Sequence, residues 1–457
     1  MPKPDMSRLC IWALCLLLAG LPLGASGMDG QSNKPSEEEA ERVYNDLNCE
    51  RTRGTEEGVD WDEVRLELFS TPFPQSMATI GPVVQRLQRV PEVAALTQGA
   101  SFCGKGQWGM EVHIHEWLLA SSHLVHDPEE ADFFLVPAYS ICMFEGGFFP
   151  LAQLDVMYTD MVRGLPYFKR NHGRDHIFTF GSGMSANVFR SWQEEIPEAI
   201  FLTPETWLFN DFPDRTEPCF NTWKDIAIPG YLHRHEILSL ASQARALASR
   251  EHLAVFLGRT DPSRGPHPAT DDADVRGSIR RLHEQGKVFV AQNLSVPEMH
   301  AVMGNAKFCF VPKGKSAWSL RFYEALFANC VPVVLSDFWE LPFEDFLHLP
   351  SFVIKWPMSE VGDQLLSFLA ALPDQVLEDY MESSRRNRCW YVYPPRLHEV
   401  DMEERADELY RVCPNLHEEN AFTGIMRILE RKQRASRSMG RFFVPPGWEA
   451  VVTTALD

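Results

Sequence analysis

Short apolar runs alternate with longer amphipathic segments along most of the chain from residue 61 onward. The short runs are rich in Val, Ile and Phe and predict buried strands, whereas apolar residues three or four positions apart predict helices. Strands are expected at 64–69, 133–139, 177–180, 199–203, 253–257, 288–291, 306–311 and 331–335. Helices are expected at 110–124, 151–165, 236–250, 274–284, 296–304, 378–388 and 403–432. Strands that alternate with helices at this spacing are typical of parallel sheets wound by crossover connections.

The alternation falls into two consecutive α/β units. We expect a first domain at 61–230 and a second at 231–400, followed by C-terminal helices and a tail at 401–457. Both domains have an ordinary size and can each bury a core of their own. Two such domains in sequence predict a central cleft between them, across which the C-terminal helices can pack back.

The first 60 residues follow a different pattern. Residues 1–27 combine a weakly basic start, an apolar run at 9–23 and a small-residue cleavage site at Ala25 and Gly27. The apolar run is short for a membrane span of about 20 residues. A cleaved signal peptide is therefore favoured over a single-pass type II signal-anchor, and either one predicts the lumen of the ER or Golgi. The polar, acidic segment 28–60 is interpreted as a stem or linker.

Composition narrows the class of protein. Hydrophobic residues make up 45% of the chain, with 30 Phe and 12 Trp, as expected of a packed globular protein. The formal net charge of −20 argues against a nucleic-acid-binding protein, because no overall positive field attracts phosphates.

The cysteines suit an oxidising compartment. Ten are present, and eight follow the targeting segment, an even number that fits structural disulfides. Eight cysteines allow 105 pairings, so the sequence does not select among them. Cys309 and Cys330 fit a disulfide and free buried thiols equally well. No C-x-x-C pair occurs, so nothing favours a zinc site.

The segment 311–356 carries the clearest candidate chemistry. Pro312, Lys313 and Gly314 end a predicted strand with turn residues, and a helix is expected from there to about Asn329. Ser316 and Ser319 are candidate N-caps of this helix.

Two charged residues of this helix are spaced to act together. Arg321 and Glu324 are three positions apart, so they project from one helical face near the N-terminus. A glycine-bearing loop, a helix N-terminus, an Arg and a Glu together suit a diphosphate and its ribose. The simpler alternative is a surface Arg paired with a nearby Glu.

The same segment contains the string G-x-S-x-W-S-x-R-x-x-E-A-L-x-x-x-C-V-P-V-V-x-S-D, followed by L-P-F-E-D. It resembles the donor-binding signature of the exostosin-like glycosyltransferases, glycosyltransferase family 47. Shorter strings elsewhere resemble the same family: D-P-E-E-A-D at 127–132, G-R-D-H at 173–176, D-I-A-I-P at 225–229 and G-R at 258–259. The matches span about residues 110–356.

The resemblance implies an α/β protein of the GT-B architecture, in which two Rossmann-like domains face a central cleft. The second domain would bind the nucleotide-sugar donor and the first the acceptor. Transfer would use a UDP-sugar as co-substrate, invert the anomeric centre and require no metal ion or other cofactor.

Parallel strands present ligand-binding groups at their carboxyl ends. Together with the signature, this rule selects a set of donor-site candidates, in which Arg321 contacts the diphosphate and Glu324 accepts hydrogen bonds from the ribose. The predicted donor site comprises Gly258, Arg259, Lys313, Gly314, Ser319, Arg321, Glu324 and Asp337.

An inverting transfer needs a general base for the acceptor hydroxyl. Glu145, in the loop after the strand 133–139, is the best-placed carboxylate, and His115 and Glu116 on the preceding helix are competitors. Some plant members of the family carry a His-Asp pair after the strand that corresponds to 177–180. Here that loop reads G-S-G-M-S, so the acceptor is not identified.

Two further motifs have simple interpretations. Asp272-Ala273-Asp274 resembles a metal-binding D-x-D motif, but it lies in a Pro- and Gly-rich loop and is interpreted as a solvated acidic turn. Asn293-Leu294-Ser295 is an N-glycosylation sequon in a predicted surface loop.

The sequence therefore predicts a secretory-pathway glycosyltransferase that moves a sugar from a UDP-sugar to a glycan or glycoprotein acceptor. It could act in a complex with another glycosyltransferase. The alternative is a catalytically silent carbohydrate-binding or scaffolding partner of such an enzyme.

Overall fold

The computed structural model describes residues 109–121, 123, 125, 131–136, 138, 140, 151–165, 167–181, 188–206, 220–260, 274–314, 317–394 and 408–438. Several predictions lie outside these ranges. They include the targeting segment 1–27, the stem 28–60, the strand 64–69, the candidate base Glu145, the candidate N-cap Ser316 and residues 272–273 of the D-x-D string.

The first sheet has four parallel strands in the order β1-β2-β3-β4. They are β1 (Phe134–Val136), β2 (His176–Thr179), β3 (Ile200–Thr203) and β4 (Ile226–Ala227). Alternate side chains of each strand enter opposite layers, as the pleat requires. Leu135 and Ile177 face α7 (Met110–Ala120), whereas Val136 and Phe178 share a core with α9 (Leu151–Gly164) and α11 (Trp192–Glu195).

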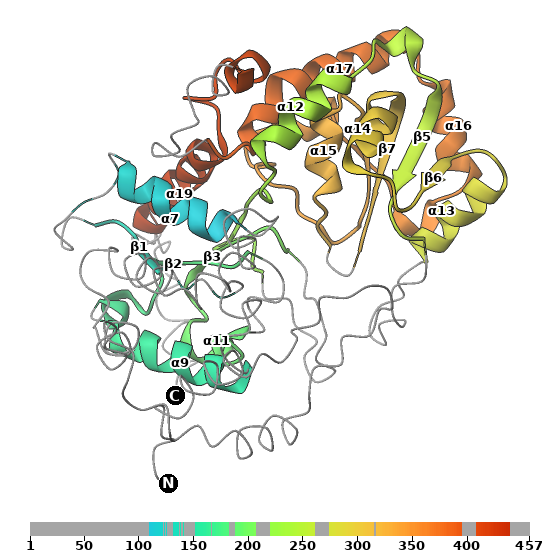
Figure 1. The fold of residues 1–457 in the computed structure, drawn as a ribbon. Helices are drawn as coiled ribbons and strands as arrows, with labels where there is room; N and C mark the ends of the chain where they lie inside the picture. The colour runs from blue at the N-terminus through green and yellow to red at the C-terminus, as the bar shows by residue number, and fades with distance from the viewer. Residues whose placement is uncertain are drawn as a thin grey trace, which may run out of the picture.

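The second sheet has five parallel strands in the order β6-β5-β7-β8-β9. They are β5 (His252–Leu257), β6 (Phe289–Ala291), β7 (Ala306–Pro312), β8 (Val331–Leu335) and β9 (Ile354–Lys355). One face is covered by α12 (Arg234–Gln243), α14 (Val296–Gly304) and α15 (Arg321–Phe327). The other is covered by α13 (Val275–Glu284) and α16 (Asp363–Ala371) (Figure 1).

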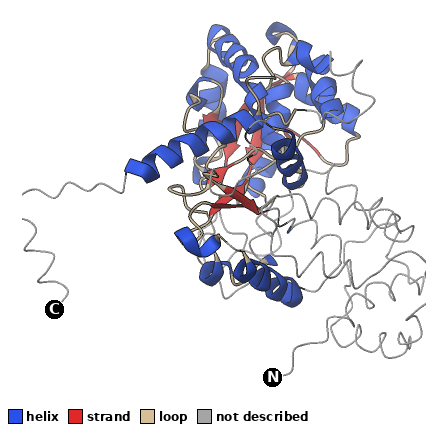
Figure 2. Ribbon diagram, turned by 90° about the vertical axis from the view of Figure 1, so that its left-hand side faces the viewer, coloured by secondary structure: helices blue, strands red, loops and turns tan. Residues whose placement is uncertain are grey.

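Helices lie on the outside of both sheets (Figure 2), so the α/β class with two parallel sheets is confirmed. Short 3-10 turns complete the fold: η2 (Phe168–Asn171), η3 (Leu247–Ser249), η4 (Leu349–Ser351), η5 (Met358–Glu360) and η6 (Arg388–Tyr391). Within the described ranges, none of the helices combines the length and the apolar character needed to cross a membrane.

The C-terminal helix returns to the first domain. In Figure 1, α19 (Ala421–Ser438) lies beside α7, and the rings of Phe422 and Trp117 stack with centroids 4.4 Å apart. Side chains of both domains consequently belong to one buried cluster, which includes Ile114 of α7, Leu326 of α15 and Ile425 of α19. The expectation that this part of the chain packs back across the junction is confirmed.

Some predicted helix ends are wrong. The single helix expected at 403–432 is interrupted, because residues 413–420 form turns between a helical stretch at 408–412 and α19. Pro414 disfavours helical geometry at the preceding residue. The helix expected at 236–250 instead ends at Gln243, where Ala244 turns to an extended conformation.

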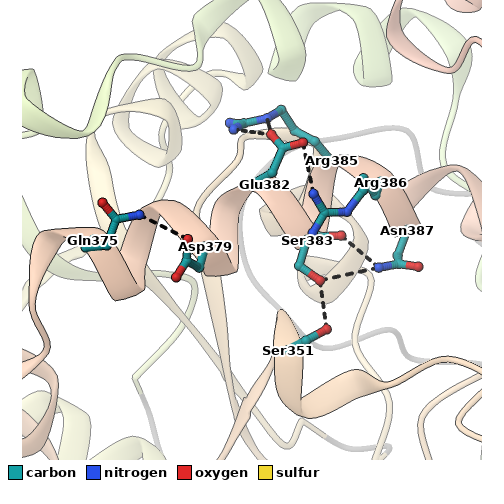
Figure 3. A network of polar contacts seen from close by, with 8 residues as sticks. All are labelled: Ser351, Gln375, Asp379, Glu382, Ser383, Arg385, Arg386 and Asn387. Carbon is teal, nitrogen blue, oxygen red and sulfur yellow. Dashed lines mark hydrogen bonds and ion pairs between the residues drawn. The ribbon is translucent and has the colours of Figure 1, made fainter.

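Helix α17 (Asp374–Asn387) is fixed by a network of side chains on its surface (Figure 3). Glu382 accepts hydrogen bonds from Arg385 at 2.7 Å and from Arg386 at 3.2 Å, one helical turn further on. The hydroxyls of Ser383 and Ser351 lie 2.7 Å apart and join α17 to η4. Of these contacts, the one between Ser383 and Ser351 ties the helix to the segment that leads into β9, whereas the pairs of Glu382 lie within the helix itself.

The structure pairs four of the eight cysteines that follow the targeting segment, in two disulfides. Cys309 of β7 is bonded to Cys330 at the entrance of β8, and Cys389 of η6 is bonded to Cys413. For Cys309 and Cys330, the structure therefore shows a disulfide and not two free buried thiols. The second joins η6 to the turn that precedes α19.

Candidate functional site

Three loops meet at the carboxyl edge of the second sheet, because β5, β7 and β8 are parallel neighbours. Gly258 and Arg259 follow β5, Lys313 and Gly314 follow β7, and Asp337 follows β8. The Lys313 N–H donates to Leu335 O at 3.0 Å, which joins the loop after β7 to the last residue of β8. The structure therefore brings together five of the eight predicted donor residues.

Arg321 and Glu324 lie on α15, which starts beyond the loop after β7. Arg321 Nη1 is 2.6 Å from Glu324 Oε2, with 23% of the Arg321 side chain and 8% of the Glu324 side chain exposed. The structure thus shows the simpler pairing of the two residues, and their contacts with a donor stay a prediction. Ser319 Oγ accepts a hydrogen bond of 3.3 Å from Arg321 N, two residues along the chain.

The Glu324 carboxyl has an unusual environment. Burial raises its pKa, the Arg321 charge opposes that shift, and the Glu236 carboxylate adds to it. The short contact with Arg321 lacks hydrogen-bond geometry, so Oε2 has no hydrogen-bond donor within the described part of the chain. The Arg321 charge compensates this oxygen electrostatically, and a contact of Glu324 with a ribose hydroxyl stays a prediction.

Asp337 is engaged in local structure. Its Oδ1 accepts a hydrogen bond of 3.0 Å from Met358 N, at the start of η5. The neighbouring Ser336 hydroxyl donates to Ala317 O at 2.9 Å, which fixes the loop before α15. These contacts give Asp337 a structural role, and its contact with a donor stays a prediction.

Arg276 of α13 was not selected from the sequence. Its Nε donates to Lys313 O at 3.1 Å and its Nη1 donates to Arg259 O at 2.8 Å. The guanidinium therefore spans the loops after β5 and β7, and burial lowers its pKa. The sequence shows three arginines on this helix, and only the fold shows which one faces the strand ends.

Glu111 of α7 has a comparable position in the first domain. Its Oε1 accepts hydrogen bonds from Ser140 Oγ at 3.1 Å and from Gly181 N at 3.0 Å. Ser140 and Gly181 follow β1 and β2, so one carboxylate joins two loops at the carboxyl edge of the first sheet. In the sequence, Glu111 lies four residues before His115, so on a helix the two side chains share one face, and this spacing could have drawn attention to Glu111.

Of the predicted bases, His115 lies on α7 and is only 1% exposed. A direct contact with an acceptor hydroxyl would need this helix or its neighbours to move. Glu145 lies outside the described residues, and the side chain of Glu116 is not among those described. The identity of the base stays a prediction.

The loop after β3 contacts the second domain. Glu205 Oε1 accepts a hydrogen bond of 3.2 Å from Ala317 N, just before α15. Thr206 Oγ1 donates to Phe338 O at 3.2 Å and accepts from Glu340 N at 2.9 Å. The first domain is therefore hydrogen-bonded to two segments that flank the candidate donor residues.

The remaining motifs have local roles. Asp274 is the N-cap of α13 and accepts a hydrogen bond of 2.8 Å from Gly277 N, which agrees with a structural interpretation of the D-x-D string. Across the described ranges, no cluster of three His, Cys, Asp or Glu residues could hold a metal ion. Asn293 is exposed, with a φ of 59°, just before the capping box that starts α14.

Two parallel-sheet domains, with cationic side chains at the strand ends of the second, suit many nucleotide-binding enzymes, and comparison with known proteins selects the glycosyltransferases among them. The Exostosin GT47 domain profile matches residues 61–372, and the chain belongs to this family.

Three of the curated relatives are plant proteins named as probable glycosyltransferases. A probable glucuronoxylan glucuronosyltransferase of Arabidopsis thaliana, IRX7, is 26% identical, over 64% of this chain and 68% of its own length. A probable glucuronosyltransferase of Oryza sativa subsp. japonica, GUT1, is 25% identical, over 61% and 67%. The probable beta-1,4-xylosyltransferase IRX10L of Arabidopsis thaliana is 25% identical, over 53% and 60%. These alignments span between about half and two thirds of each chain. The solved glycosyltransferase AviGT4 matches at 12% identity over 58% of this chain and 91% of its own, with a TM-score of 0.23, which is too low to compare the folds.

Proposed function

We propose that this glycosyltransferase transfers a sugar from a UDP-sugar to a glycan or glycoprotein acceptor in the lumen of the secretory pathway. The reaction inverts the anomeric centre and uses no metal ion. The observation that carries the proposal is the convergence of the loops after β5, β7 and β8 beside Arg276, with α15 and its Arg321 next to them. Ligands of open parallel sheets bind at this edge.

The charges of the site suit a diphosphate leaving group. Negative charge develops on the diphosphate as the glycosidic bond to the nucleotide breaks, and fixed cations placed there lower the barrier without a metal ion. Arg321 and Arg276 are the candidates for this role. Glu324 is the candidate acceptor for the ribose hydroxyls, through the part of its carboxylate that Arg321 Nη1 does not already contact.

The acceptor side is assigned to the first domain. An acceptor hydroxyl must lose a proton during transfer, and Glu145 and His115 are the candidate bases. Glu111 supports this region, since it holds the loops after β1 and β2 together. The relatives named as glucuronosyl- and xylosyltransferases make glucuronic acid and xylose the first donor sugars to test.

A UDP-release assay on the full chain, expressed through a secretory host, tests the function. The donors are UDP-xylose, UDP-glucuronic acid, UDP-galactose, UDP-glucose and UDP-N-acetylglucosamine, each with a panel of oligosaccharide acceptors and with or without EDTA. We expect acceptor-dependent release of UDP from one donor, unchanged by EDTA. Loss of activity in EDTA would contradict the metal-independent mechanism.

The same assay separates the enzyme from a silent partner. UDP binding without transfer from any donor, also when a second family member is added as an inactive variant, would favour the scaffolding alternative. Failure to bind UDP at all would remove both the donor site and the proposed function.

A further inference from the structure

We propose that Arg276 is a donor-site residue that contacts the diphosphate of the nucleotide and holds the two loops that enclose it. This inference rests on the proposed function. The residue lies outside the signature segment 311–356, on a helix that belongs to a different crossover connection.

The position of the guanidinium is set by its two carbonyl partners. Arg259 is the second residue after β5 and Lys313 is the first after β7, and both strands end at the same edge of the sheet. A side chain that donates to both carbonyl oxygens, at 2.8 and 3.1 Å, must lie between the two loops. The guanidinium carbon also lies 5.7 Å from the centre of the Phe256 ring, which limits its orientation further.

Among the described residues, no side chain balances the charge of Arg276. In the described part of the chain no carboxylate forms an ion pair with it, and its partners are neutral carbonyl groups. A partly desolvated cation without an anionic partner is unfavourable. The diphosphate of a nucleotide sugar, bound at this edge, supplies the missing negative charge.

The hydrogen-bonding capacity points to the same ligand. A guanidinium has five N–H donors, and the two carbonyl bonds use two of them. The remaining donors suit the oxygens of a phosphate group, since the planar fork matches pairs of such oxygens. Because the carbonyl bonds keep the fork in place before the donor arrives, little side-chain freedom is lost on binding.

Arg280 provides a matched control on the same helix. It lies one turn further on, its side chain is 44% exposed, and it pairs with Glu284 at 4.0 Å. An Arg280→Ala variant removes the same charge from the same helix without touching the loops.

The test is calorimetric titration of the full-length protein and its variants with UDP and with UMP, which lacks the second phosphate. For Arg276→Ala we expect UDP affinity to fall by about 10- to 100-fold, the range for hydrogen bonds to charged groups. UMP affinity should fall less, and Arg280→Ala should leave both unchanged. Arg276→Lys, which keeps the charge and loses the fork, should lose about 3- to 10-fold for UDP.

Two results would overturn the proposal. The first is an unchanged UDP affinity in Arg276→Ala or, if that variant does not fold, in Arg276→Lys. The second is an equal loss of affinity for UDP and for UMP in Arg276→Ala. This result would mean that Arg276 only holds the two loops in place and does not contact the diphosphate. If the parent protein binds no UDP, the proposed function itself is wrong, and this outcome is distinct because it appears before any substitution is made.

Discussion

Arg321 and Glu324 form an ion pair within α15, three residues apart, and the predicted donor contacts would involve the same two side chains. The carboxylate is almost fully buried, and the guanidinium beside it supplies the only positive charge among the causes that shift its pKa. A nucleotide sugar that contacts Arg321 would therefore bind a guanidinium whose charge already stabilises the buried Glu324 carboxylate.

Arg321→Ala should weaken UDP binding by about 1.5–3 kcal/mol if the guanidinium meets the diphosphate. It should also lower the free energy of unfolding by roughly 2 kcal/mol, because Glu324 then lacks its counter-charge. Glu324→Gln should cost less stability, since burial already disfavours the ionised carboxylate. Calorimetry and chemical denaturation measure the two effects, with Arg245→Ala, an exposed pair with Glu251, as control. Unchanged UDP affinity in Arg321→Ala would remove this residue from the donor site.

Asp225 provides a prediction on pH. Burial raises the pKa of this carboxyl from 3.8 to about 6, although Lys224 and two backbone N–H groups oppose the shift. The folded state therefore holds a proton that the unfolded chain releases between pH 4 and 6, and stability falls as pH rises through this window.

The comparison is with Asp225→Asn, which does not titrate. Relative to this variant, the parent should lose roughly 3 kcal/mol of unfolding free energy between pH 4 and 6.5. Chemical denaturation at several pH values measures the difference. If the parent instead gained stability over this range, Lys224 would dominate over burial.

At the level of single residues, the sequence predicted which loop residues lie at the carboxyl edge of the second sheet and missed the side chains that join them, while their contact with a donor stays a prediction. Gly258, Arg259, Lys313 and Gly314 were found because the end of a strand is a local signal. Arg276 and Glu111 act on residues 17 to 70 positions away, and no local pattern encodes those contacts.

Individual elements were predicted best where local signals mark their ends, as in the fully buried run of β8 and the capping box that starts α14. Strand β8 and helix α14 have the expected bounds of 331–335 and 296–304. Other elements end at residues different from those predicted, because contacts with distant parts of the chain set where they stop. Helix α12 ends at Gln243, and the N–H of Arg245 just beyond it donates to Gly304 O. The break in the predicted helix 403–432 coincides with Pro414, next to a disulfide that the sequence could not pair.

The disulfides link neighbouring elements, and their contribution to stability can be measured. The pairs Cys309–Cys330 and Cys389–Cys413 close loops of similar length, with sequence separations of 21 and 24. Replacing either pair by Ala should cost about 3 kcal/mol of unfolding free energy through the greater entropy of the unfolded chain. Denaturation of the two double variants tests this value, and a cost below about 1 kcal/mol for both would contradict it.

At the scale of the whole molecule, α19 connects the end of the chain to the first domain. Phe422 is 2% exposed and stacks on Trp117 of α7. Phe422→Ala should therefore lower the free energy of unfolding by about 3–5 kcal/mol, the cost of emptying a buried aromatic site. Tyr410→Ala, at a position 41% exposed and close in sequence, is the control and should change little. A small effect of Phe422→Ala would mean that α19 is not needed to hold the first domain.

The two-domain α/β organisation and the family could be predicted because they depend on repeated local patterns and one long signature. The acceptor could not, because it depends on loops of the first domain, where the sequence departs from the family pattern and where Glu145 lies outside the described residues.

The central claim is that a nucleotide diphosphate sugar binds at the carboxyl edge of the second sheet. A crystal structure of the protein saturated with UDP tests it most directly. We predict that the diphosphate lies between the loops after β5 and β7, within hydrogen-bond distance of Arg276, with the ribose near Glu324. UDP bound elsewhere, or no bound UDP at saturating concentration, would contradict this account.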